Sequence, residues 1–166
     1  MAVQSFDIAE RFQTPVFVAS DLDIGMNDWM VKRLDWDDAY RPDRGKVLDA
    51  EALAKVQKFS RYLDVDGDGI AARTLPGVGG KGAYFVRGSG HDKHAAYTED
   101  SDAYQELVDR LKRKFEHAAT VMPKPEFHRR PGADVGLVTI GGCDAAVREA
   151  ADKLQAQGTV VDVMRI

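Results

Sequence analysis

The chain has 166 residues, and 44% of them are hydrophobic, which suffices for the core of one ordinary domain or for parts of two. Its formal net charge of -4, without a long lysine and arginine run, argues against a nucleic-acid or anionic-membrane partner. A single cysteine, Cys143, excludes an internal disulfide framework and favours a reducing compartment. With no apolar stretch of roughly 20 residues and no signal-peptide layout, we expect a cytoplasmic protein without a membrane span.

The first elements that the sequence predicts are a helix and a strand. Apolar residues recur at helical spacing over residues 3–13, and a Thr-Pro pair follows them. Residues 16–20 are short, apolar and rich in β-formers, so they predict a buried strand, parallel to its neighbours. Asp21, Asp23 and Asn27 come next. They either face a ligand crevice at the carboxyl end of that strand or form a loop with Asx turns.

The middle of the chain predicts irregular structure around one short helix. Residues 28–48 hold both tryptophans, mixed charge and no clean period, which indicates an extended arm. Asp49 is placed to cap a helix that runs to about Phe59. Residues 61–100 then contain eight of the fifteen glycines together with four aromatic residues. A flexible linker needs no aromatic residues, so we expect an ordered loop that packs on a neighbour.

The strongest helical pattern lies at residues 102–122, where apolar side chains follow one face. Either Thr98 or Ser101 is placed to cap this helix, and prolines after Met122 end it. The basic run at residues 112–114 is the densest in the chain, and such a run on a helix is typical of a solvated face.

The last part of the chain predicts a βαβ unit. A buried strand at residues 135–140 leads through a Gly-Gly turn into a helix, and a second strand follows at residues 159–164. A helix of that length makes the right-handed crossover between parallel strands. The Gly-Gly turn is either an anion site formed by backbone N–H groups or only a tight turn. Because a βαβ unit needs further strands and a second layer, we expect a fragment of a larger protein.

Two glycine-rich motifs partly match ligand loops. Asp64, Asp66 and Asp68 resemble the start of an EF-hand calcium loop, but Leu75 stands where the bidentate glutamate belongs. A polar turn is the alternative, with weak cation binding still open. The glycines within residues 77–82 resemble a phosphate loop, yet no Gly-Lys-Ser/Thr signature follows.

Three further residues carry possible chemistry. His91 and His94 are spaced to share a metal with Asp92, although no other cysteine or histidine cluster completes the set. His91 alone suits acid-base work or interface hydrogen bonds. Cys143 begins a helix, where an exposed thiol becomes more acidic, but no neighbouring histidine activates it, so a small packed residue is the alternative.

Several motifs, in order, resemble one family. They are residues 6–27 (FDIAERFQTPVFVASDLDIGMN), 44–48 (RGKVL), 64–69 (DVDGDG), 73–77 (RTLPG), 84–91 (YFVRGSGH) and 97–99 (YTE). Together they resemble the alpha subunit of 2-oxoacid:ferredoxin oxidoreductases, and the 2-oxoglutarate type is the nearest likeness. The resemblance covers nearly the whole chain.

The resemblance implies an α/β fold in three parts. Residues 1–25 correspond to the end of a thiamine-binding pyrimidine-type domain, and residues 26–130 to an extended arm with helices and the glycine-rich loop. Residues 133–166 correspond to the start of a transketolase C-terminal-like domain. The family oxidatively decarboxylates a 2-oxoacid to an acyl-CoA with thiamine diphosphate and Mg, and passes electrons through an iron-sulfur cluster to ferredoxin. The partners implied are a beta subunit and a gamma subunit.

The chain holds little of that apparatus. The Tyr-Pro-Ile-Thr-Pro segment of the family has no counterpart, and one cysteine cannot supply the usual four cluster ligands. Lys93 stands where the resemblance implies an acidic residue after the His-Asp pair. We therefore assign no catalytic, cofactor or metal residue, and expect Arg73, Arg87 and His91 to contact the rest of the complex. The alternatives are a non-catalytic module, with a cation at the Asp64 to Asp68 turn, and a self-associating small protein.

Overall fold

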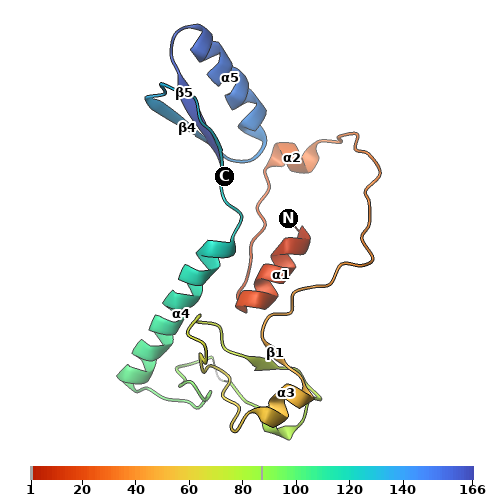
Figure 1. Ribbon diagram of the computed structural model, residues 1–166, viewed down its shortest axis with the longest axis vertical. Helices are drawn as coiled ribbons and strands as arrows, with labels where there is room; N and C mark the ends of the chain where they lie inside the picture. Colours follow the sequence, from red (N-terminus) through yellow and green to blue (C-terminus); the bar gives the residue numbers. More distant parts are fainter. Residues whose placement is uncertain (1, 87) are drawn as a thin grey trace. The chain divides into compact units, whose positions relative to one another are not determined.

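The computed structural model describes residues 2–86 and 88–166, which form two compact units. Unit 1 comprises Met1–Val18 and Ala39–Met122, and unit 2 comprises Ala19–Asp38 and Pro123–Ile166. Arg87, one of the expected interface residues, lies outside the described residues. In the described part of the chain, no helix is both long enough and apolar enough to cross a membrane. The expected mixed α/β class is confirmed (Figure 1).

Unit 1 is built on two helices and much irregular chain. Helix α1 spans Ala2–Phe12, in agreement with the predicted helix, and α4 spans Ser101–Val121. The two helices meet where the ring of Phe12, 1% exposed, packs edge-on against His117 with centroids 5.6 Å apart. Asp100 caps α4, since its side chain accepts a hydrogen bond from Ala103 N. The expected caps, Thr98 and Ser101, are therefore wrong by one or two positions.

The rest of unit 1 has short elements. Strand β1 (Val47–Leu48) pairs in parallel with β2 (Arg73–Thr74), helix α3 spans Ala50–Lys55, and a 3-10 turn, η1, spans Gly80–Gly82. Asp49 caps α3 as predicted by accepting from Ala52 N at 2.8 Å, but the helix ends four residues before Phe59. The buried side chains around these elements include Leu53, Ile70 and Ala71.

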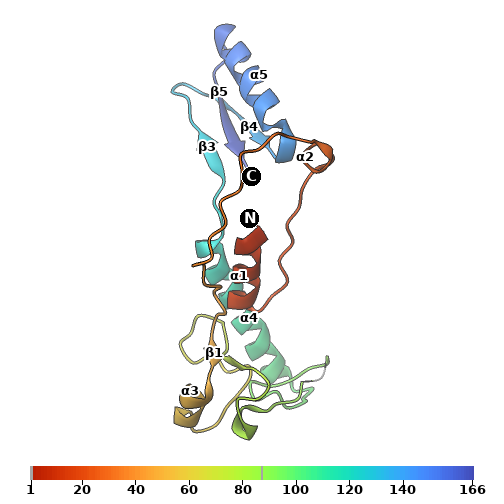
Figure 2. The same cartoon turned by 90° about the vertical axis from the view of Figure 1, so that its right-hand side faces the viewer.

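Unit 2 contains the predicted βαβ unit and one strand more. Strand β4 (Val135–Thr139) and β5 (Val161–Arg165) are parallel and joined through the 3-10 turn η2 (Gly141–Cys143) and helix α5 (Asp144–Ala156). Strand β3 (Glu126–His128), which the sequence did not indicate, adds antiparallel to β5, so the order is β3-β5-β4 (Figure 2). The central strand is thus the last of the three in sequence.

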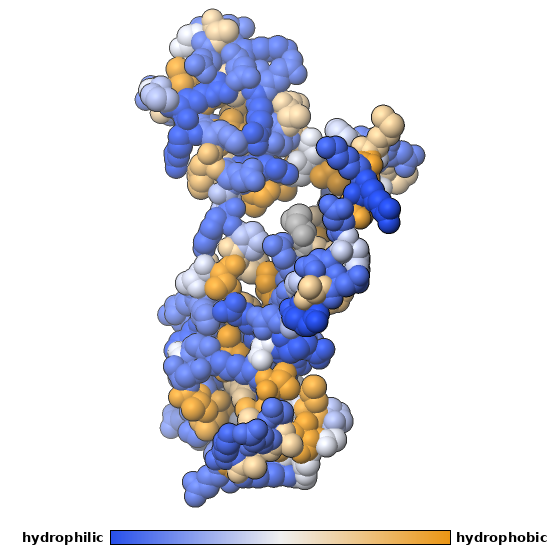
Figure 3. Space-filling view, turned by 45° about the vertical axis from the view of Figure 1, so that its right-hand side comes forward, coloured by the Kyte–Doolittle hydropathy of each residue, from blue (hydrophilic) through white to orange (hydrophobic). Residues whose placement is uncertain are grey.

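Helix α5 buries one face of this sheet. Ala151, Val161 and Val163 are 0 to 2% exposed, and Leu137, Val147 and Leu154 pack around them. On the opposite face Phe127, Met164 and Val138 stand side by side in register, and Phe127 and Val138 are more than half exposed. The sheet therefore has one buried and one open face among the described residues, and apolar patches interrupt the hydrophilic surface in Figure 3.

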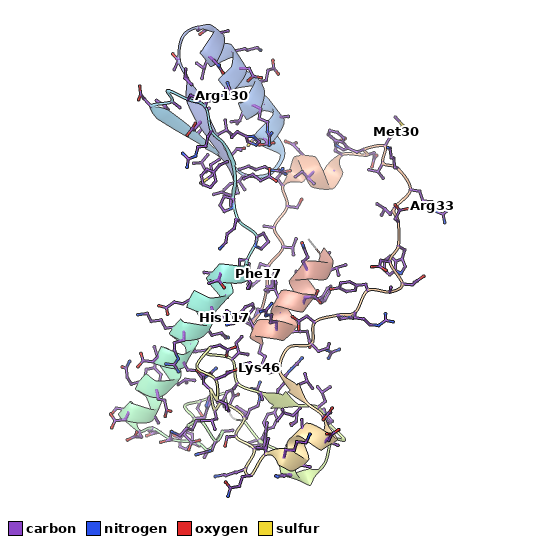
Figure 4. The ribbon with its side chains drawn as sticks, viewed as in Figure 1. Phe17, Met30, Arg33, Lys46, His117 and Arg130 are labelled. Carbon is purple, nitrogen blue, oxygen red and sulfur yellow. The ribbon has the colours of Figure 1, made fainter. Side chains whose placement is uncertain are left out.

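The strand predicted at residues 16–20 is wrong. The backbone there makes no ladder with another described strand, and Phe17 is 92% exposed on an extended segment (Figure 4). The β-rich composition gives only a preference, and a strand forms where a neighbour pairs with it and buries one face. Residues 28–48 are irregular as expected apart from β1, and Met30 and Trp36 are among their exposed side chains.

The buried face of the sheet in unit 2 yields a stability prediction. Val163→Ala removes two methyl groups from the contact with α5 and should lower the free energy of unfolding by about 2 kcal/mol. Val138→Ala, on the next strand but on the open face, should cost less than about 0.5 kcal/mol. Urea denaturation of the two variants measures both values. Equal losses would contradict the assignment of the buried face.

Candidate functional site

Residues 64–70, called here the aspartate loop, fold around their own carboxylates. Asp64 accepts hydrogen bonds from Gly67 N and Gly69 N, both at 3.0 Å, and Asp68 accepts from Ile70 N at 2.8 Å. Short acidic side chains commonly stabilise turns by bonding nearby backbone N–H groups. The Asp64 side chain is only 6% exposed, so these bonds hold a carboxylate that is almost out of solvent.

The cation inside the aspartate loop is the ammonium of Lys46. Its Nζ lies 2.6 Å from Asp66 Oδ1, 2.7 Å from Asp68 Oδ1 and 3.0 Å from the carbonyl oxygen of Ile70. Burial disfavours the charged form of Lys46, but the hydrogen bonds to the two carboxylates outweigh it and raise its pKa. The hydrogen bond from Lys46 to Asp66 also lowers the pKa of Asp66. Lys46 comes from the segment just before β1, as Figure 4 shows.

Helix α4 covers the other side of the aspartate loop. Arg113 Nη2 lies 3.1 Å from Asp64 Oδ2, and Arg110 Nη1 donates to the carbonyl oxygen of Gly69 at 2.9 Å. His117 Nδ1 is 3.7 Å from Asp68 Oδ2. Gly69 passes so close to the helix that a Cβ on it would lie 2.6 Å from Lys114 Cα. The aspartate loop is therefore held on one side by its ion pairs with Lys46 and on the other by ion pairing and close backbone contact with α4.

This geometry leaves little room for a metal in the aspartate loop. Asp64, Asp66 and Asp68 place carboxylate oxygens within 4.8 Å of one another, the only such group of three or more ligating side chains that residues 2–86 and 88–166 contain. The Lys46 ammonium already bonds Asp66 and Asp68, and Asp64 is bonded to Arg113 and two N–H groups. Because calcium needs six or more oxygen ligands, the donor set does not fit the cation that the motif indicates.

In unit 2 the structure brings two predicted features together. Asp21 caps helix α2 (Leu22–Met26) by accepting from Ile24 N, and the same carboxylate accepts from Gly142 N in the turn before α5. The bonds from Ile24 and Gly142 lower the pKa of Asp21. Asp21 thus makes the predicted local cap. The N–H group of Gly142 in the Gly-Gly turn binds the carboxylate of Asp21, an anion from the same chain.

The two histidines of the glycine-rich stretch have separate partners. His91 stacks on Tyr62 with centroids 4.0 Å apart, and its Nδ1 is 3.2 Å from the carbonyl oxygen of Asp92. His94 Nδ1 is 2.8 Å from Ser60 Oγ. The Asp92 side chain accepts from the backbone N–H groups of His94 and Ala96. These contacts fix a turn, and among the described residues the two histidines and Asp92 do not form a group that could hold a metal.

The other candidates also have structural partners. Lys81, in the glycines that resemble a phosphate loop, points its Nζ toward the carbonyl oxygen of Ala54, 3.4 Å away. Cys143 is exposed, so its expected role as a packed residue is wrong, and its Sγ lies 2.9 Å from Thr139 Oγ1. With one cysteine in the sequence, the chain cannot supply the four ligands of an iron-sulfur cluster.

Arg73 is engaged inside unit 1. Its guanidinium pairs with Glu10 of α1 and donates to the carbonyl oxygen of Arg44 at 3.1 Å. Arg44 also pairs with Glu10, at 2.9 Å. The hydrogen bond from Arg73, partly opposed by desolvation, lowers the pKa of Glu10. A role for Arg73 or His91 in contacts with another subunit stays a prediction.

The sequence reasoning missed the residues that hold the aspartate loop. Lys46 was part of a family motif without an assigned role, and residues 112–114 were expected to be solvated. Lys112 is solvated as expected, with 74% of its side chain exposed, but Arg113 pairs with Asp64 and Lys114 is 7% exposed. A helical projection places residues 110, 114 and 117 on one face of α4 and would have indicated burial there, but it cannot identify Lys46 as the partner of the aspartates.

Comparison with known proteins confirms the resemblance to the alpha subunit of 2-oxoacid:ferredoxin oxidoreductases, over nearly the whole chain. One curated relative is subunit alpha of 2-oxoacid:ferredoxin oxidoreductase 2 from Aeropyrum pernix, 30% identical over 161 residues. Those residues are 95% of this chain but 24% of the relative. The chain thus spans about a quarter of the relative that it matches. Models of known protein families give no match.

A solved structure supports the same fold. The 2-oxoglutarate:ferredoxin oxidoreductase from Magnetococcus marinus, with 2-oxoglutarate, coenzyme A and succinyl-CoA bound, matches with a TM-score of 0.77 and 23% identity. The match covers 96% of this chain and 27% of that chain. The described chain therefore has the fold of one part of a larger oxidoreductase chain.

Gly69 gives a test of the close packing against α4. Gly67 and Gly69 have nearly the same backbone conformation, with φ of +80° and +81°, but only Gly69 meets the helix backbone. Gly67→Ala should cost about 1 kcal/mol for the left-handed conformation alone. Gly69→Ala should cost at least about 3 kcal/mol, because the loop must also move away from α4. Thermal unfolding of the matched pair measures this difference, and equal melting temperatures would exclude the close contact.

The lowered pKa of Asp66 gives a pH dependence. A carboxyl whose folded pKa lies below its ordinary 3.8 contributes stability above that value and loses it as the pH falls through the folded pKa. Unit 1 should therefore lose stability on acidification, and Lys46→Met should remove part of this loss. The variant should cost about 2 kcal/mol near neutral pH, because it removes the partner of Asp66, which is more than half exposed, and also that of Asp68, whose side chain is 24% exposed.

Urea midpoints measured from neutral pH to below 3.8 follow the Asp66 contribution. The matched control is Lys55→Met, which breaks only an exposed pair with Glu51 on α3. It should leave both the midpoint and its pH dependence close to those of the unchanged protein. An identical pH profile for Lys46→Met and the unchanged protein would mean that Lys46 is not the partner of Asp66.

Proposed function

We propose that this chain is part of the alpha subunit of a thiamine diphosphate-dependent 2-oxoacid:ferredoxin oxidoreductase and is inactive without other subunits. The observation that carries the proposal is the similarity to the Aeropyrum pernix alpha subunit along 95% of the chain. The fold shared with the Magnetococcus marinus enzyme supports it. The reaction proposed for the complete complex is oxidative decarboxylation of 2-oxoglutarate, or a related 2-oxoacid, to an acyl-CoA.

The residues of this chain support a structural role within that complex. The carboxylates of the aspartate loop are bonded to Lys46, Arg113 and backbone N–H groups, so they stabilise the fold of unit 1. The described residues contain no second cluster that could ligate a metal. We therefore propose that thiamine diphosphate, Mg and the iron-sulfur cluster bind in other parts of the complex, including a beta subunit and, in some members, a gamma subunit.

The domain division drawn from the family belongs to the same proposal. Residues 1–25 would end a pyrimidine-type domain, residues 26–130 would form the arm, and residues 133–166 would begin a transketolase C-terminal-like domain. The parallel pair β4 and β5 under α5 supports the last of these assignments. Arg73, Arg87 and His91 remain our proposed contacts with neighbouring subunits. The single cysteine supports a reducing, cytoplasmic location.

The alternative function, a cation-binding module at the aspartate loop, has less support. Its motif begins correctly, and its three carboxylates converge. The ammonium of Lys46 takes the position that a calcium ion would need, 2.6 to 2.7 Å from two of those carboxylates. The geometry therefore favours an internal ion cluster over a site for a free cation.

Two measurements test the proposal. The purified chain, given 2-oxoglutarate, coenzyme A, thiamine diphosphate and Mg, should not reduce methyl viologen, because we propose that the cofactors bind in other parts of the complex. Coexpressed with a tagged beta subunit from the same genome and the remainder of the alpha subunit, it should copurify in an equimolar complex that reduces the dye. Dye reduction by the chain alone, or failure to enter the complex, would exclude the proposed role.

A further inference from the structure

The open face of the sheet in unit 2 has an apolar end and a polar end. Phe127, Met164 and Val138 lie side by side at the apolar end, one from each strand, and Phe127 and Val138 are 51% and 60% exposed. At the polar end Arg129 pairs with Asp162 at 2.9 Å. A sheet that contains parallel strands is normally covered on both faces. The apolar end of this face therefore needs a cover that the described residues do not supply.

Gly136 marks this face as a place of close approach. It stands within β4, in register with Asp162 of β5, where a glycine weakens the strand because it has no side chain to pack. Its φ lies outside the left-handed region, and a Cβ built on it meets no described atom within 4 Å, so the described chain does not require a glycine there. A glycine inside a strand commonly marks a site where another backbone comes close. A hollow of about 350 Å³, lined in part by Gly136, Val138 and Met164, leaves room for one.

The strand order indicates which kind of segment covers the open face. Strand β5 has β3 on one side and β4 on the other, and β3 is antiparallel, so a further parallel strand joins this sheet at the outer edge of β4. A connection from β5 to that edge crosses the sheet in the direction opposite to the connection from β4 to β5. Because such crossovers are right-handed in nearly all cases, reversing the direction moves the connecting helix to the opposite face. Since α5 covers the first face, the next crossover helix lies on the open one.

We propose that the open face binds an amphipathic helix from the remainder of the alpha subunit, which leads from β5 to a strand at the outer edge of β4. The chain spans 24% of its curated relative and 27% of the solved chain that it matches, so subunits of that length have ample residues to supply this helix. The helix packs apolar side chains on Phe127, Met164 and Val138, and its backbone comes close at Gly136. This inference rests on the proposed function and adds to it a surface and the segment that occupies it.

A matched pair of leucine substitutions tests the close approach. Gly136→Leu puts a side chain into the space over the open face, and Ala145→Leu adds one at an exposed position of α5. In the chain alone neither variant should lower the melting temperature, and Gly136→Leu should raise it by up to about 4 °C, because leucine suits a strand better than glycine. In the coexpressed complex with the tagged beta subunit and the remainder of the alpha subunit, Gly136→Leu should reduce the copurified chain about tenfold or more, and Ala145→Leu should leave it unchanged.

Photocrosslinking in the same complex identifies the occupant of the open face. Replacing Phe127 by p-benzoylphenylalanine keeps the phenyl ring on β3 and adds a group that reacts with whatever packs against it. We expect crosslinks to a helical segment from the remainder of the alpha subunit, located by mass spectrometry of the crosslinked peptides. Crosslinks to the beta subunit or to a second copy of this chain would overturn the assignment.

The results also separate this inference from the function on which it rests. If Gly136→Leu assembles as well as the unchanged chain, or if Ala145→Leu weakens assembly equally, the open face is not the binding surface, although the proposed function stands. If the unchanged chain does not enter the complex, the proposed function fails and the inference fails with it.

Discussion

The ammonium of Lys46 is the interaction on which the rest of unit 1 depends. It connects the segment before β1 with a loop about 20 residues later in the sequence, and its three oxygen partners come from Asp66, Asp68 and Ile70. The register of β1 and β2 follows directly, since Lys46 precedes β1, and Arg73 N donates to the Lys46 carbonyl oxygen at 2.9 Å. The aspartate loop, which has little secondary structure of its own, is thus held in one conformation by ion pairs and hydrogen bonds with Lys46.

Helix α4 supplies the second constraint. At Gly69 there is no space between the aspartate loop and the backbone of α4. From the same helix, Arg110 bonds the carbonyl oxygen of Gly69 and Arg113 pairs with Asp64. The aspartate loop is therefore held by contacts inside the chain, and the packing of the glycine-rich stretch on neighbouring subunits stays a prediction. The two kinds of contact are compatible, since the outer side chains Tyr84 and Phe85 remain partly or largely exposed.

The features that could be predicted from the sequence are those with a local signal. The periods of α1, α4 and α5 and the βαβ unit follow from spacing alone, because each apolar face repeats every turn or every second residue. The strand at residues 16–20 failed because composition cannot tell whether a partner strand is present. Strand β3 is three residues long and close to two prolines, too short for any period.

The site was harder to predict for a different reason. The three aspartates gave a clear motif, but the identity of their cation depends on Lys46, which no local pattern connects to them. Asp21 and Gly142 are 121 residues apart, so the sequence indicated a polar residue after a strand and a Gly-Gly turn but not the hydrogen bond between them. Long-range polar contacts are set by the whole fold, and a single sequence carries no periodic signal for them.

The strand order β3-β5-β4 has a consequence for how unit 2 assembles during synthesis. Among the described residues, strands β3 and β4 make no ladder with each other, and each pairs with β5, which the ribosome makes last of the three. Until β5 emerges, the apolar side chains of β3 and β4 have neither a paired edge nor the core beneath α5. The sheet of unit 2 can therefore form only after β5 has been made, and until then β3 and β4 leave unpaired strand edges on the nascent chain, a kind of surface that promotes aggregation.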